Sequence, residues 1–176
     1  RFIRLHPTHP NVDYAYYLRA LSAYKFKDGL LDRLFSANPA SRDMAPLRES
    51  YSELALLLNE FPNSQYASDA RQRMLWLREL LARSEIFASD YYLRRGAYVA
   101  AANRGAYVIE NYPDTVARAD ALARMVEAYY KLGRTEEANR SLRVLALNHP
   151  QYPDFDANGN LVLEERIRNR DRSWAN

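Results

Sequence analysis

The chain has 176 residues, of which 48% are hydrophobic and 27% are charged, and none is cysteine. The absence of cysteine excludes disulfides, thiol nucleophiles and cysteine-based zinc sites, and it leaves the redox compartment open. The 25 Lys and Arg residues are nearly balanced by 22 Asp and Glu residues, so the net charge of +3 argues against a dedicated nucleic-acid binder.

Apolar residues at helical spacing, with no alternation typical of strands, predict an all-α chain. Asn11, Ser64 and Thr115 each precede such a stretch and can cap the helix that follows. No run of 18 apolar residues occurs, so we expect no membrane span. The expected helices cover residues 11–27, 45–61, 66–82, 84–95, 97–111, 116–131 and 135–148.

A tyrosine, a glycine, an alanine and a proline recur at a displacement of 37 residues, close to the period of about 34 of a tetratricopeptide repeat. They are Tyr92, Gly96, Ala101 and Pro113, then Tyr129, Gly133, Ala138 and Pro150. In a helix pair the aromatic fills the interior, the glycine permits the reversal, and the alanine lets the second helix approach closely. Gly105, where a large apolar residue is usual, predicts a close approach of two backbones.

A longer repeat has a period of 51 residues, because Phe61–Ser64 matches Tyr112–Thr115 and the same pairs follow each copy. Those pairs are Asp69-Ala70 with Arg73-Met74, and Asp120-Ala121 with Arg124-Met125. We therefore expect a tetratricopeptide-repeat array over residues 1–150 and a C-terminal tail over 151–176. The expected units are about 11–62, with an inserted short helix and loop at 30–46, then 66–113 and 116–150.

His6 and His9 stand three residues apart, and a proline follows each. Proline makes the preceding residue extended, and no third ligand lies nearby, so we interpret both as turn residues and not as metal ligands. The chain also lacks a Walker loop, a glycine-rich dinucleotide turn, a nucleophile elbow and a His-Glu-x-x-His motif. We expect neither enzymatic activity nor a cofactor.

Acidic and amide side chains in the tail have the spacing of a twelve-residue EF-hand loop. They are Asp154, Asp156, Asn158, Asn160 and Glu165, with Gly159 among them. Pro150 and Pro153 stand where the entering helix would be, so a reverse turn at Asn158–Gly159 is the preferred interpretation. A calcium-regulated module is the alternative.

Three stretches are more specific than a general repeat pattern. They are His6-Pro-Thr-His-Pro-Asn-Val-Asp-Tyr-Ala-Tyr-Tyr-Leu-Arg19, Phe61-Pro-Asn-Ser-Gln-Tyr66 and Tyr91-Tyr-Leu-Arg-Arg-Gly-Ala-Tyr-Val-Ala-Ala-Ala-Asn-Arg104. With them, residues 1–150 resemble the BamD family, the tetratricopeptide-repeat lipoproteins of the outer-membrane β-barrel assembly machinery.

The resemblance implies a non-catalytic periplasmic scaffold at the outer membrane. The implied partners are BamA, through the POTRA domain nearest its barrel, BamC, BamE and unfolded outer-membrane protein precursors, with no nucleic acid. The family is attached to the membrane only by a lipid on an N-terminal cysteine. Because the chain lacks that cysteine and the first repeats, we expect it to be the C-terminal part of such a protein. Another periplasmic repeat adaptor, for instance one that coordinates envelope division, is the competing function.

The family's arginine that forms a salt bridge with BamA corresponds to Arg104, in the Asn-Arg pair after an alanine-rich run. A planar guanidinium suits this task because it can bind a carboxylate through two N–H groups. From the residues alone, the alternative is an exposed arginine without a partner. Arg94 and Arg95 are secondary candidates for the same interface, and the alternative for them is that they complement the last turn of a helix.

Overall fold

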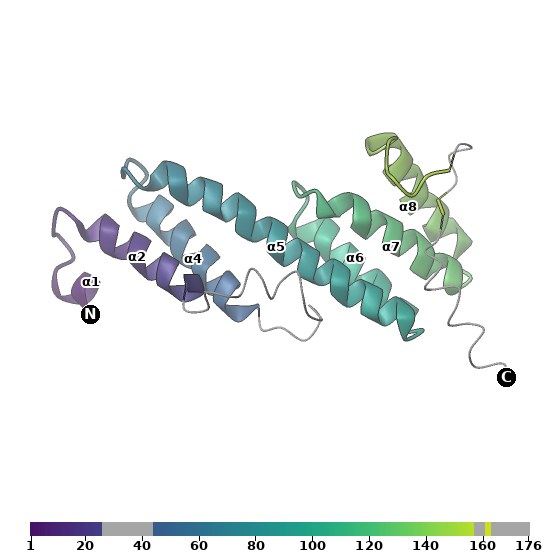
Figure 1. Ribbon diagram of the computed structural model, residues 1–176, viewed down its shortest axis with the longest axis horizontal. Coiled ribbons are helices and arrows are strands. Elements are labelled where there is room, and N and C mark those ends of the chain that lie inside the picture. The colour runs from purple at the N-terminus through teal and green to yellow at the C-terminus, as the bar shows by residue number, and fades with distance from the viewer. Residues whose placement is uncertain (26–43, 157–160, 163–176) are drawn as a thin grey trace. The chain divides into compact units, whose positions relative to one another are not determined.

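The computed structural model describes residues 1–25, 44–156 and 161–162, and there the chain is helical apart from one isolated antiparallel bridge between Phe155 and Leu161 (Figure 1). The helices are α1 (Phe2–Leu5), α2 (Val12–Lys25), α4 (Ala45–Glu60), α5 (Ala67–Arg94), α6 (Tyr98–Asn111), α7 (Ala117–Lys131) and α8 (Thr135–Asn148). Within these described ranges, no helix is long and apolar enough to cross a membrane. The predicted all-α fold is confirmed.

Helix α5 runs without a break through the point where two helices, 66–82 and 84–95, were expected. That prediction is wrong because Ala82-Arg83-Ser84 contains no glycine or proline, and alanine and arginine are strong helix formers. Of the insert expected at 30–46, only residues 44–46 are described, and they lie at the start of α4. The division into units of 11–62, 66–113 and 116–150 stays a prediction.

Four helices end at a residue that proline follows, and the four ends share one geometry. The end residues of α1, α4, α6 and α8 have φ between −131° and −136° and ψ between 49° and 64°, because proline excludes the helical conformation before it. Each donates its N–H to the carbonyl four residues earlier, over 2.8–2.9 Å. These residues are His6, Phe61, Tyr112 and His149.

The residues at the start of α5 and α7 use their hydroxyls differently. Ser64 accepts a hydrogen bond from the backbone N–H of Tyr66 over 3.2 Å, just before α5 begins. Thr115 instead donates its hydroxyl to the carbonyl of Tyr112 over 2.7 Å, and α7 has no side-chain cap. The predicted capping by Thr115 is therefore wrong, because the preceding turn offers its hydroxyl a closer partner.

Two residues after the last residue of α5 and of α7, the chain reverses at a glycine with a left-handed backbone, Gly96 at φ 73° and Gly133 at φ 72°. After each glycine, the next N–H bonds back to the tyrosine carbonyl of the last turn: Ala97 to Tyr92 and Arg134 to Tyr129, both over 2.9 Å. This is the Schellman arrangement, which needs a residue without a Cβ at the reversal. The 37-residue repeat thus has two copies of one helix end.

The described chain forms two compact units, Arg1–Leu81 and Ala82–Asn176. In the first unit α2 packs against α4, as Figure 1 shows, and the buried Ser50 hydroxyl donates to the Ala20 carbonyl over 2.9 Å. On the surface of this unit, Asp69 accepts hydrogen bonds from the Tyr17 hydroxyl and from Arg73, each over 2.5 Å.

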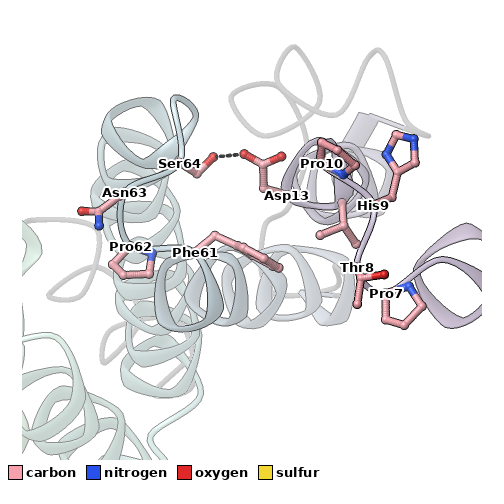
Figure 2. A pocket seen from close by; sticks show the side chains of 10 residues that line it. Pro7, Thr8, His9, Pro10, Asp13, Phe61, Pro62, Asn63 and Ser64 are labelled. Carbon is pink, nitrogen blue, oxygen red and sulfur yellow. Dashed lines mark hydrogen bonds between the residues drawn. The ribbon is translucent and has the colours of Figure 1, made fainter.

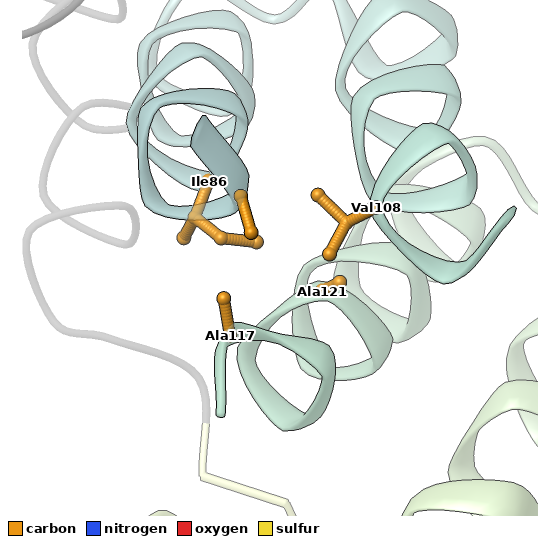
Figure 3. Close-up of a cluster of buried hydrophobic side chains, with 5 residues drawn as sticks. Ile86, Val108, Ala117 and Ala121 are labelled. Atoms are coloured by element: carbon orange, nitrogen blue, oxygen red, sulfur yellow. The ribbon is translucent and has the colours of Figure 1, made fainter. Parts of the chain in front are cut away.

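In the second unit α7 packs against both α6 and α8. Its core has small side chains, with Ile86 and Val108 meeting Ala117 and Ala121 of α7 (Figure 3). Gly105 is a residue of α6 that faces α7. A Cβ added to it would be 2.6 Å from Met125 Cγ and 2.9 Å from the Ala121 carbonyl oxygen. The predicted close approach at this glycine is confirmed.

Within the second unit, the residues after α8 pack back against α7 and α8. Tyr152 is buried against Ala119, Leu122 and Leu145, and Phe155 and Leu161 lie partly buried beside it. Its hydroxyl donates to Asp120 over 2.8 Å. Burial, and then the hydrogen bond to Asp120, raise the pKa of the Tyr152 hydroxyl far above its usual range.

Candidate partner-binding site

Arg104 lies on α6 and bonds to a residue of α5. Its Nη1 donates to Glu85 Oε2 over 2.9 Å. The side chain of Arg104 is 44% exposed, whereas that of Glu85 is 7% exposed. The alternative of an exposed arginine without a partner is therefore wrong, because the guanidinium is anchored at one end and open to solvent along the rest.

The spacing of residues on α5 explains how this contact forms. Glu85, Ser89 and Tyr92 follow at intervals of four and three residues, so they share one face of the helix. The Ser89 hydroxyl donates to the Ala101 carbonyl over 3.0 Å, and Ala101 is fully buried. This close contact between α5 and α6 brings Arg104, one turn after Ala101, within reach of Glu85.

Two tyrosines connect the candidate arginines. The Arg104 guanidinium lies 5.9 Å from the Tyr92 ring centre, and the Arg95 guanidinium lies 5.3 Å from the Tyr91 ring centre. The two rings meet edge to face at 5.7 Å. Tyr91, Tyr92, Arg95 and Arg104 therefore form one surface, here named the arginine–tyrosine corner.

The electrostatics of the corner are cationic. The hydrogen bond to Glu85 raises the pKa of the Arg104 guanidinium above its already high usual value, so the group stays charged. Arg95 is exposed just beyond α5, while Arg94 lies half-buried in the last turn of α5, where a cation complements the helix dipole. The position of Arg94 therefore agrees with the alternative interpretation, in which this arginine complements the last turn of a helix instead of binding a partner.

Sequence reasoning missed Glu85 and also a second ion pair, in which Arg124 Nε bonds to Asp90 Oδ1 over 2.5 Å. Both acidic residues lie on the part of α5 after residue 82, and both reach across to another helix. The spacing of Glu85, Ser89 and Tyr92 could have indicated a shared face. That face lies within the expected helix 84–95, but nothing in the sequence showed which helix packs against it.

The first unit has an open cleft of about 470 Å³ between two proline turns, Pro7–Asp13 and Phe61–Ser64 (Figure 2). The Ser64 hydroxyl donates to Asp13 Oδ2 over 2.6 Å at its edge. His6 and His9 form the turn that was predicted, with the His9 N–H donating to the His6 carbonyl over 3.2 Å. In the described part of the chain, no three metal-ligating side chains lie together.

The possible calcium loop is only partly described. The Asp154 backbone carbonyl accepts the N–H of Val162 over 2.7 Å, beside the bridge of Phe155 with Leu161. Asn158, Asn160 and Glu165, together with the reverse turn expected at Asn158–Gly159, lie outside the described residues. The reverse turn therefore stays a prediction, with calcium binding by this segment as its untested alternative.

Comparison with known proteins identifies the family. Residues 1–145 match the family model YfiO, described as an outer membrane lipoprotein. The chain belongs to this family. The resemblance expected from the sequence is confirmed, and the family places the chain among outer membrane lipoproteins.

Several curated relatives carry the name outer membrane protein assembly factor BamD. One from Neisseria meningitidis serogroup A is 44% identical over 87% of this chain and 57% of its own length. One from N. meningitidis serogroup B is 40% identical over 99% of this chain and 62% of its own length. One from Vibrio cholerae is 37% identical over 84% of this chain and 61% of its own length. The chain thus spans about three-fifths of the length of these relatives, whose name is that of an assembly factor.

Proposed function

We propose that the chain is a non-catalytic scaffold in the assembly of outer-membrane β-barrel proteins. Its membership of the outer membrane lipoprotein family supports this role, as does its similarity to proteins named assembly factors. The arginine–tyrosine corner is its docking surface, and the partner is the POTRA domain of BamA nearest the barrel. The exposed, anchored guanidinium of Arg104 is the observation that carries this assignment.

The chemistry of the corner fits an acidic protein surface. Arginine and tyrosine are enriched at the energetic centres of interfaces, because both offer large contact areas and oriented hydrogen-bond donors. Arg104 lies over the Tyr92 ring and also bonds to Glu85, so its cation is held at a defined place, whereas the Arg95 guanidinium has a ring contact with Tyr91. A carboxylate of the partner would meet a prearranged donor there.

The remaining partners are assigned by resemblance to the family. BamE would contact the same C-terminal half as the POTRA domain. BamC and unfolded outer-membrane protein precursors would bind toward the N-terminal repeats of the full-length protein. No group at the corner has the arrangement of a catalytic set, so we assign it binding alone.

Calorimetric titration of the chain with the barrel-proximal POTRA domain of a matching BamA tests the proposal. Arg104→Gln removes the charge that is anchored by Glu85, and Arg95→Gln removes the second charge of the corner as the matched control. We expect Arg104→Gln to weaken binding at least tenfold, about 1.4 kcal/mol, and Arg95→Gln to weaken it less. Thermal melting of each variant verifies that it is folded.

Two results would contradict the proposal. A folded wild-type chain that does not bind the POTRA domain would exclude BamA docking and favour another periplasmic adaptor. Equal binding by the wild type and Arg104→Gln would keep BamA as the partner and remove the corner as the docking surface.

A further inference from the structure

Glu85 is an acidic residue in an apolar place. It lies on α5 with only 5% of its surface exposed, one turn after Ala82 and beside Ile86, both of which belong to the buried core of the second unit. Burying a carboxylate is costly unless charged or polar groups compensate it. The Glu85 carboxylate therefore needs charged or polar partners to remain buried in the helix interface.

One of those groups is Arg104, and the pair is asymmetric. The carboxylate end is 7% exposed and the guanidinium end is 44% exposed, so Glu85 belongs to the protein interior and Arg104 to the surface. Solvent reaches the guanidinium end of the pair, and this screening limits the net contribution of the pair to stability. Stability alone is therefore a weak reason for this arrangement.

The geometry leaves part of the guanidinium available, since 44% of the Arg104 side chain is exposed. Arginine has five N–H donors in a planar fork, and the contact with Glu85 uses Nη1 over 2.9 Å. The Tyr92 ring, 5.9 Å from the guanidinium carbon, adds a second constraint on its orientation. A carboxylate approaching from solvent can bind the remaining donors while Glu85 keeps its own.

We propose that Glu85 is a positioning residue, which holds the Arg104 guanidinium so that its free N–H groups are presented to a carboxylate of the partner. This inference rests on the proposed docking at the corner. A free arginine side chain loses rotamer entropy when it is fixed. A side chain fixed before docking loses less of it on binding, which strengthens the complex.

Side-chain NMR tests the positioning without a partner. The Nε–H group of Arg104 is expected to be ordered on the picosecond-to-nanosecond timescale in the wild type and mobile in Glu85→Gln. The exposed Arg95 is the internal comparison and should be mobile in both proteins. An Arg104 side chain that is equally mobile with and without the Glu85 charge would overturn the inference.

A double-mutant cycle tests its effect on docking. Titrations with the same POTRA domain use the wild type, Glu85→Gln, Arg104→Gln and the double variant. Glu85→Gln should weaken binding about threefold or more in the wild type and change nothing in the Arg104→Gln background. Equal weakening in both backgrounds would mean a merely structural role, and tighter binding by Glu85→Gln would mean that Glu85 competes with the partner; either would overturn the inference.

Arg104→Lys provides a second variant if Glu85→Gln does not fold. Lysine keeps the charge but lacks the planar fork that can bind two carboxylates at once, so its binding should fall toward that of Arg104→Gln. Lysine that binds as well as arginine would overturn the inference. A wild-type chain that binds no POTRA domain would overturn the proposed function itself, while the NMR result would still decide whether Glu85 holds Arg104.

Discussion

Each unit contains one copy of the aspartate–arginine pair of the 51-residue repeat, yet the arginine binds a different partner in each. In the first unit Asp69 and Arg73 bond to each other along one helix. In the second unit Arg124 crosses to Asp90 instead. Both aspartates accept a tyrosine hydroxyl, Asp69 from Tyr17 and Asp120 from Tyr152, so the difference lies in the arginine. The repeat therefore fixes helices and turns, while each ion pair depends on which side chain lies opposite.

Burial separates the two pairs further. The side chains of Arg73 and Asp69 are 33% and 45% exposed, whereas those of Arg124 and Asp90 are each 11% exposed. Solvent screens the first pair, so its net contribution is small. Removing one member of the second pair leaves a charge in a nearly dry place.

The largest expected effect follows from this difference. Arg124→Met should lower the free energy of unfolding by about 3 kcal/mol or more, because it leaves the Asp90 carboxylate buried without this arginine. The matched variant Arg73→Met should cost less than about 1 kcal/mol. Urea unfolding followed by circular dichroism measures both, and similar losses would contradict the distinction.

Gly105→Ala should be the next most damaging change. The added Cβ would lie 2.6 Å from Met125 Cγ and 2.9 Å from the Ala121 carbonyl, so α6 and α7 must separate, at a cost of about 1–3 kcal/mol. Gly133→Ala is the control, because a Cβ added there meets no atom within 4 Å. Only the positive φ of residue 133 disfavours this alanine, so the variant should lose about 1–2 kcal/mol of stability.

A double variant identifies the cause of the Gly105→Ala effect. Adding Met125→Ala should restore only part of the stability, because the Ala121 backbone carbonyl stays in the way. Complete restoration would show that the methionine side chain alone sets the spacing of the two helices.

Alkaline pH should weaken the second unit through Tyr152. The folded state raises the pKa of this hydroxyl above its ordinary value of 10.0, so its contribution is complete below about pH 10 and is lost as pH rises further. Tyr152→Phe should flatten that decline in the free energy of unfolding. An unchanged alkaline profile for the variant would exclude the tyrosine as its source.

Acid should have the smallest effect, in the first unit. The hydrogen bond from Arg73, more than that from Tyr17, lowers the pKa of the Asp69 carboxyl below its ordinary 3.8. Its contribution is therefore present above that value and is lost as pH falls below it. Asp69→Asn should slightly flatten the acid limb of a stability profile. A steeper acid limb in this variant would contradict the assigned sign.

The helix ends could be predicted from the sequence because their causes are local. Proline restricts the residue before it, and glycine permits the left-handed reversal, so Pro113 and Gly133 mark their ends without reference to the rest of the fold. The contact at Gly105 was predictable for a similar reason, since a helical residue without a side chain leaves space for a neighbour.

The ion pairs of α5 could not be predicted in the same way. The partners Glu85 and Arg104 are 19 residues apart, and Asp90 and Arg124 are 34 apart. Each pairing depends on the register of one helix against another, which no local pattern encodes.

Docking of the POTRA domain at the arginine–tyrosine corner is tested most directly by site-specific photocrosslinking. A crosslinking residue at Val99, which is 58% exposed in the first turn of α6, stands four residues after Arg95 of the corner, and one at Leu75, 64% exposed in the first unit, is the control. We expect the POTRA domain to crosslink at Val99 and not at Leu75. Crosslinking at Leu75 with none at Val99 would contradict docking at the corner.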